Sequence, residues 1–155
     1  MINNECYNAY DFEYSHIVNE IITPISIYSS PYSAEGSSLI TDALWDTGAT
    51  HSVLSLRIAN ELNLLPVDNV YIGGIDGNKS SNVVMVTVTL PNNMVLTGRR
   101  FYVSNIPGAD VLIGMDIISM GDFNISNAYG KTLFSFVIPP FKSKISYTKL
   151  VTETP

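Results

Sequence analysis

Short segments of apolar residues recur along the chain and predict a protein built mainly of β-strands. The residues Ile17, Ile21, Ile25 and Ile27 indicate one or two strands within residues 17–28, and Pro24 favours an edge or a bulge there. Further strands are expected at residues 39–45, 52–54, 67–75, 84–90, 94–103, 111–113, 123–127 and 132–137. The all-apolar run Val111-Leu112-Ile113 is typical of a strand that is buried on both faces.

Turn residues between these segments predict three hairpins. Asp76-Gly77 favours a type I′ turn, because both central positions of that turn need positive φ. Pro91-Asn92-Asn93 and Ala128-Tyr129-Gly130-Lys131 separate two later pairs of predicted strands. The expected strands therefore pair mostly with their neighbours in sequence.

Two short helical segments are expected among the strands. Ser55 is a suitable N-cap for a helix over residues 56–62, where Leu56, Ala59 and Leu62 have helical spacing. A helical turn is expected over residues 115–120. These patterns together predict an all-β fold class, mostly strands with one or two short helices, arranged as a single lobe.

The 155 residues fit one domain with a polar arm and a tail. Residues 1–15 have no clear period and are interpreted as an N-terminal arm that packs on a neighbour. Residues 16–138 form the expected domain. Residues 139–155 follow Pro139-Pro140 as a C-terminal tail, whose role as a linker, a strand or a subunit contact stays open.

Composition excludes several classes of protein. Hydrophobic residues make up 46% of the chain and charged residues 14%, which argues against wholesale disorder. The net charge is −6, and the 8 Lys and Arg residues form no dense basic cluster of the kind found in nucleic-acid-binding proteins. The only basic pair, Arg99-Arg100, is interpreted as a solvated position on a strand or turn.

The N-terminus and the cysteine content predict a cytoplasmic protein. The single Cys6 cannot form an internal disulfide, which fits a reducing compartment. Residues 1–5 lack the basic and apolar regions of a signal peptide, and no apolar run approaches the ~20 residues of a membrane span. We therefore expect neither a membrane partner nor a nucleic-acid partner.

The stretch Ala43-Leu44-Trp45-Asp46-Thr47-Gly48-Ala49-Thr50 is the strongest candidate for chemistry. An apolar strand delivers a carboxylate, Asp46, on a tight turn, where a charge must be paired, hydrogen-bonded or neutralised. Two such acids close enough to share a proton can activate a water. The chain has no internal repeat, so it contains only one Asp-Thr-Gly turn.

The order of the motifs resembles the retropepsin-like aspartic proteases. The specific parts are Asp46-Thr47-Gly48-Ala49 and the late Leu112-Ile113-Gly114, with a Gly-rich hairpin between them. The resemblance covers residues 17–137 and implies a closed β-barrel of the acid-protease fold. It also implies an aspartic endopeptidase that acts on a peptide or protein substrate.

The resemblance assigns roles to individual residues. Asp46 is implied to be the catalytic carboxylate, Thr47 to buttress the active-site turn by hydrogen bonding, and Gly48 to allow close approach of a bound peptide. The flap that closes over substrate maps to residues 73–78, with Gly73, Gly74, Ile75, Asp76 and Gly77 as the expected flap and substrate-binding positions. Leu112-Ile113-Gly114 is expected beside the active-site turn.

Two positions depart together from the retroviral pattern. Retroviral members commonly have an acid two residues after the motif glycine and an arginine after the late glycine, and the two form an ion pair. This chain has Thr50 and Met115 there. Since both charges are absent, none is left buried without a partner, and the chain resembles the cellular and bacterial branch more closely.

Each chain supplies only one acid on an Asp-Thr-Gly turn. This implies a homodimer in which two Asp46 side chains meet across a two-fold axis. Like charges that close cannot both ionise easily, so the pair holds one proton. The ionised acid then takes a proton from water while the protonated acid polarises the scissile carbonyl. Neither a metal nor a cofactor is required. The alternative is a catalytically silent module of the same fold that binds peptides or assists assembly.

Other polar residues are weaker candidates. His16 and His51 lack a matching metal-ligand spacing and are interpreted as ordinary surface or core residues. A Ser-His-Asp triad using His51 with Ser52 or Ser55 stays open, although no nucleophile-elbow pattern supports it.

The remaining acids and aromatic residues have structural interpretations. Asp116 is expected to cap the helix that begins near it. Asp76 and Asp110 are interpreted as turn residues. Trp45 and Tyr71 are candidates to border a substrate cleft, with core packing as the default for both.

Overall fold

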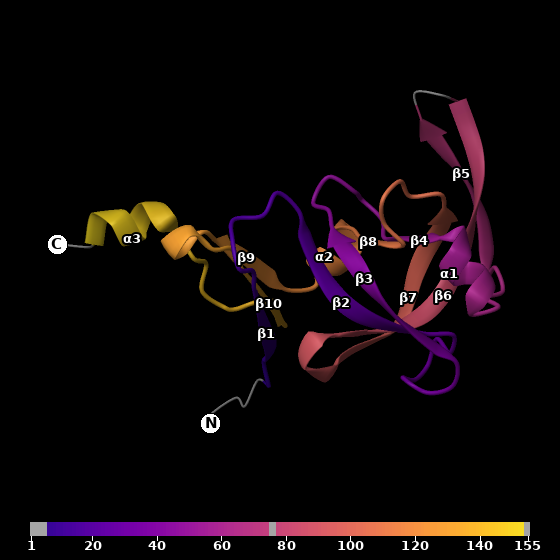
Figure 1. Ribbon diagram of the computed structural model, residues 1–155, viewed down its shortest axis with the longest axis horizontal. Helices are drawn as coiled ribbons and strands as arrows, with labels where there is room; N and C mark the ends of the chain where they lie inside the picture. Colours follow the sequence, from indigo (N-terminus) through magenta and orange to yellow (C-terminus); the bar gives the residue numbers. More distant parts are fainter. Residues whose placement is uncertain (1–5, 75–76, 154–155) are drawn as a thin grey trace.

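The computed structural model describes residues 6–74 and 77–153, and 47% of the residues are in strands. Figure 1 shows a barrel flanked by a smaller sheet on one side and by a projecting hairpin on the other. The strands are β1 (Asn8–Glu13), β2 (Ile21–Tyr28), β3 (Ser38–Trp45), β4 (Val53–Ser55), β5 (Asp68–Gly74), β6 (Gly77–Leu90), β7 (Met94–Ser104), β8 (Val111–Ile113), β9 (Asp122–Ser126) and β10 (Leu133–Ile138). The α-helices are α1 (Leu56–Glu61), α2 (Met115–Ile118) and α3 (Tyr147–Glu153). The predicted fold class is confirmed.

Six strands close into the barrel in the order β2-β3-β8-β4-β7-β6, with β6 pairing back to β2. Two of the neighbouring pairs, β3 with β8 and β4 with β7, are parallel, and the others are antiparallel. Strand β5 pairs with β6 outside this ring and is the last strand of its sheet. Closure leaves β5 as an edge strand beside the barrel.

Alternation along β2 explains how the barrel interior is filled. Ile21, Thr23, Ile25 and Ile27 are buried on one face, while the side chains between them are more exposed. The buried hydroxyl of Thr23 accepts a hydrogen bond from the Trp45 indole N–H at 2.9 Å. The predicted strand is therefore present, but it begins at Ile21 rather than at Ile17.

The two later hairpin turns and the helices α1 and α2 follow the sequence patterns, whereas helix α3 lies in the C-terminal tail, where no helix was expected. The β6–β7 and β9–β10 hairpins turn at residues 91–93 and 128–130, where Asn92, Asn93 and Tyr129 have positive φ. Helix α1 begins after Ser55, whose side chain accepts a hydrogen bond from the Ile58 N–H. The predicted Asp76-Gly77 turn lies partly outside the described residues.

A second sheet has the order β1-β10-β9 and stands beside the barrel (Figure 1). Strand β1 lies within the predicted N-terminal arm, yet it pairs with β10 of the same chain from Asn8 to Glu13. Tyr10 is buried and packs edge-on against Phe134 and Phe136. Both phenylalanine rings also contact Trp45, which joins this sheet to the barrel.

Helix α3 projects beyond the β1-β10-β9 sheet at the C-terminal end (Figure 1). Its side chains are mostly exposed, including Leu150 and Val151. Across the described part of the chain, no helix has both the length and the apolarity needed to cross a membrane.

Candidate active site

The Asp-Thr-Gly turn begins where strand β3 ends. Asp46 donates its backbone N–H to the Ile113 carbonyl at 2.9 Å, which ties the start of the turn to β8. The Asp46 Oδ1 atom accepts the Gly48 N–H at 2.8 Å, and the Ala49 N–H donates to the Asp46 carbonyl. The carboxylate is partly exposed, and its orientation is set by the backbone of its own turn.

The late glycine motif packs directly against this turn. The N–H groups of Met115 and Asp116 donate to the carbonyls of Ala49 and Thr50 at 2.8 and 3.2 Å. A Cβ atom at position 114 would lie 2.7 Å from the His51 carbonyl carbon and 2.9 Å from the Ala49 oxygen, so only glycine fits. The two sequence motifs therefore meet in space.

A buried serine ties the end of the turn to helix α2. Ser52 is fully buried, accepts the Gly114 N–H at 3.0 Å and donates its hydroxyl to Asp116. This link was not predicted from the sequence, because Ser52 and Asp116 lie 64 residues apart and neither has a local signal for the other.

The structure corrects the capping role expected for Asp116. The N-cap of α2 is Gly114, and Asp116 lies within the first turn. Its carboxylate accepts the Ser52 N–H, the Ser52 hydroxyl and the Ile117 N–H. Asp116 therefore anchors the segment after the Asp-Thr-Gly turn.

Thr47 and Gly48 are exposed at the surface of the turn. Within the described residues, the Thr47 hydroxyl has no hydrogen bond. Beside the turn lies a groove of about 320 Å³ whose walls include Trp45, Asp46, Thr47, Phe123 and Ile125. Phe123 and Ile125 are 38% and 42% exposed, so an apolar surface adjoins the candidate catalytic carboxylate.

A cleft of about 610 Å³ lies between the barrel and the hairpin formed by β5 and β6. Thr50 and His51 line it from the turn, Val70 and Tyr71 from β5, and Leu112 from β8. Its remaining walls are Val53, Tyr102, Ser104, Asn105, Ile106 and Pro107. Asp46 does not line this cleft, although Leu112 pairs with Leu44 just before it.

The predicted flap positions are only partly described. Gly73 and Gly74 end β5 and pair with Asn78 and Gly77 of β6. Ile75 and Asp76 lie outside the described residues. Tyr71, in the middle of β5, is 79% exposed and borders the cleft. Trp45 is instead buried in the core, the default expected from its sequence context.

The possible Ser-His-Asp triad is not assembled. Ser52 donates to Asp116, and Ser55 donates to Asp110, so neither hydroxyl is hydrogen-bonded to His51. The His51 ring instead stacks on Tyr102, with the ring centroids 4.8 Å apart. Among the described residues, no three His, Cys, Asp or Glu side chains form a group that could hold a metal ion.

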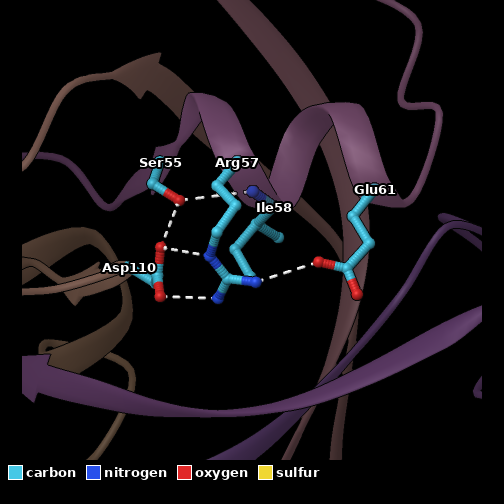
Figure 2. A network of polar contacts seen from close by, with 5 residues as sticks. All are labelled: Ser55, Arg57, Ile58, Glu61 and Asp110. Atoms are coloured by element: carbon cyan, nitrogen blue, oxygen red, sulfur yellow. Dashed lines mark hydrogen bonds and ion pairs between the residues drawn. The ribbon is translucent and has the colours of Figure 1, made fainter.

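A polar network holds helix α1 against Asp110, which directly precedes β8 (Figure 2). Asp110 accepts two hydrogen bonds from Arg57, at 2.6 and 3.1 Å, and one from the Ser55 hydroxyl at 2.7 Å. Arg57 also bonds Glu61 at 2.9 Å. The hydrogen bonds that Asp110 accepts, first those from Arg57 and then that from Ser55, lower its pKa. Asp110 is therefore part of an ion-pair network, more than the turn residue expected from the sequence.

Comparison with known proteins agrees with this arrangement. The family described as "gag-polyprotein putative aspartyl protease" matches residues 36–120, more than half of the chain. The chain belongs to this family, which confirms the resemblance to retropepsin-like aspartic proteases. None of the curated proteins compared with the chain matches it.

Two solved structures share the fold. A retropepsin-like aspartic protease from Rickettsia conorii superposes with a TM-score of 0.55 at 11% identity, over 86% of this chain and 96% of that one. The retroviral protease-like domain of Ddi1 from Leishmania major gives a TM-score of 0.50 at 18% identity, over 70% of this chain and 82% of that one. At these identities the likeness shows the fold alone.

Proposed function

We propose that this chain is an aspartic endopeptidase that acts as a homodimer, with Asp46 as its catalytic residue. The observation that carries the proposal is the Asp46 turn itself. Its carboxylate is partly exposed, oriented by the Gly48 N–H, and held against β8 and α2 by backbone hydrogen bonds. Membership of the aspartyl protease family supports this assignment.

A second copy would supply the second acid. Two Asp46 side chains across a two-fold axis make one site from two identical halves. The apolar groove beside Asp46 and Thr47, with partly exposed Phe123 and Ile125, is a surface that such a partner would cover. The exposed Thr47 hydroxyl would then lie close enough to the partner chain to hydrogen-bond with it.

The pair of acids would hydrolyse a peptide bond through an activated water. One Asp46 is ionised and takes a proton from the water, whose oxygen attacks the carbonyl carbon. The other Asp46 is protonated and donates its proton to the carbonyl oxygen. In the second step the Asp46 that is now ionised takes a proton from a hydroxyl of the tetrahedral intermediate, and the Asp46 that is now protonated donates its proton to the nitrogen. The C–N bond breaks, a carboxylic acid and an amine are released, and the pair of acids again holds one proton.

The cleft has the features of a site for an extended peptide. Val70 and Tyr71 line it from β5, whose outer edge has no neighbour among the strands that the structure describes. A bound peptide would add to this edge by main-chain hydrogen bonds, and its side chains would enter the cavity. Residues 73–77 would close over it as a flap.

Replacement of Asp46 by Asn tests the proposal. The wild-type chain should cleave members of a broad peptide library between acid and neutral pH, and Asp46→Asn should lose cleavage while its sedimentation as a dimer is unchanged. Asp42→Asn is the matched control, because Asp42 is an exposed acid on β3, the strand that leads to Asp46. An Asp46→Asn variant as active as the wild type would refute the mechanism. A monomer without any cleavage would favour the silent peptide-binding module.

A further inference from the structure

A second, smaller cavity of about 280 Å³ adjoins the cleft. His51 and Tyr102 line both cavities, and their rings stack on each other. This stacked pair therefore lies where the two spaces adjoin. The lining of the smaller cavity also contains charged side chains, those of Arg99 and Arg100 from β7 and of Asp116 from α2.

Arg99 is the basic group in this cavity without a carboxylate partner. Its Nε–H donates to the Thr97 carbonyl at 2.9 Å, and Nη1 contacts the Met120 sulfur at 3.2 Å. Among the ion pairs of the described residues, none includes Arg99. A guanidinium has five N–H donors, so three remain for a ligand. The side chain is partly buried, which strengthens its interaction with an anion.

The other charged groups of the cavity are already engaged. Arg100 forms an ion pair with Asp68 at 2.7 Å. Asp116 accepts three hydrogen bonds from Ser52 and Ile117, so its negative charge is directed toward those donors. Arg99 is thus the group left to bind an incoming anion.

We propose that this cavity binds the carboxylate of an acidic side chain of the peptide held in the cleft. The proposal rests on the proposed function, and it names the substrate class as peptides with a Glu or Asp away from the scissile bond. The acidic side chain passes the stacked rings of His51 and Tyr102 and meets the free edge of the Arg99 guanidinium. Charge-assisted hydrogen bonds to a carboxylate are the strongest that this edge can make.

The balance of charge favours a carboxylate over a phosphate group. One free guanidinium faces the cavity, and Asp116 lies on the same lining. A doubly charged phosphate would be repelled more strongly by Asp116 than a singly charged carboxylate would be. Gln is neutral and has nearly the same shape as Glu, so the difference in affinity between a Glu peptide and the matching Gln peptide measures the effect of the negative charge.

The test measures binding and cleavage separately. Binding is measured with the full chain carrying Asp46→Asn and with fluorescent decapeptides in which one position at a time is Glu or Gln. Cleavage of the same peptides is measured with the wild-type chain. At one position, away from the scissile bond, the Glu peptide should bind about tenfold more tightly than its Gln partner. Arg99→Gln should remove this preference, and Arg99→Lys should keep part of it, because Lys retains the charge and loses the planar fork. Arg100→Gln, a change of equal charge, should keep the preference within about twofold.

The outcomes separate the two proposals. Cleavage by the wild type with equal binding of all Glu and Gln pairs would overturn the acidic-residue proposal and leave the protease proposal intact. A preference for Glu that survives Arg99→Gln would also overturn it. No cleavage and no peptide binding at any position would overturn both.

Discussion

Ser52 donates its backbone N–H and its hydroxyl to the same carboxylate, that of Asp116, at 3.1 and 2.7 Å. The hydroxyl also accepts the Gly114 N–H. One buried side chain therefore connects the segment after the Asp-Thr-Gly turn to the late glycine and to helix α2. The position of the candidate catalytic turn depends on this connection.

Replacing Ser52 by Ala should lower the free energy of unfolding by about 2 kcal/mol. The change removes the acceptor of the buried Gly114 N–H and one donor to Asp116. Urea denaturation followed by tryptophan fluorescence measures the effect. Ser119→Ala, an exposed serine at the end of α2, should change stability by less than about 0.5 kcal/mol. Equal effects of the two substitutions would contradict the anchoring role of Ser52.

Gly114→Ala should be among the most destabilising glycine substitutions. The new Cβ would lie within 3 Å of three backbone atoms of Ala49 and His51, and rigid backbone cannot yield as a flexible side chain can. A loss of about 3 kcal/mol is expected. Thermal unfolding compares it with Gly108→Ala, where φ is +77° but no atom lies within 4 Å of the added Cβ. That variant should lose only about 1–2 kcal/mol, and the reverse order would refute the packing argument.

Local patterns were enough to predict most of the barrel. Burial at Ile25 and Ile27 follows from alternation, the Ser55 cap from its position before a helical pattern, and the β6–β7 turn from Asn92 and Asn93. Each of these signals lies within a few residues of the element that it predicts. The Asp-Thr-Gly and Leu-Ile-Gly motifs were likewise visible, and their contact followed from the family resemblance.

Features that depend on distant partners were missed. Strand β1 contains Asn8, Asp11 and Glu13 and has little strand propensity, yet it forms because β10 offers a pairing edge. The bonds from Ser52 to Asp116 and from Arg57 to Asp110 join segments more than 50 residues apart. No local pattern encodes such a pair, since each partner alone resembles an ordinary turn or surface residue.

Tyr10→Ala tests whether the N-terminal arm is part of the folded core. Tyr10 is 7% exposed, and its ring packs against Phe134 and Phe136. Truncation of a large buried aromatic residue should lower the free energy of unfolding by about 3 kcal/mol or more. Tyr32→Ala is the control, because Tyr32 lies in a loop and is 84% exposed. A Tyr10→Ala variant as stable as this control would mean that β1 is a dispensable arm.

Acid should weaken the protein partly through Asp110. The hydrogen bonds from Arg57 lower the pKa of Asp110 below its usual value, and the hydrogen bond from Ser55 lowers it further. A carboxyl group whose pKa is lower in the folded state stabilises the fold above its unfolded pKa of about 3.9, and this contribution is lost as the pH falls through the folded pKa. Asp110→Asn should therefore be less stable than the wild type near neutral pH, and the difference should shrink below about pH 4.

A double-mutant cycle assigns this effect to the Arg57 pair. Near neutral pH, Arg57→Gln and Asp110→Asn should each lower the midpoint of urea unfolding. The double variant should lose less stability than the sum of the two single losses, because each single change already breaks the same interaction. At pH 3 the coupling between the two substitutions should be smaller, since protonated Asp110 no longer pairs with the guanidinium. Additive effects at neutral pH, or a coupling that does not change with pH, would show that the ion pair in Figure 2 does not stabilise the fold.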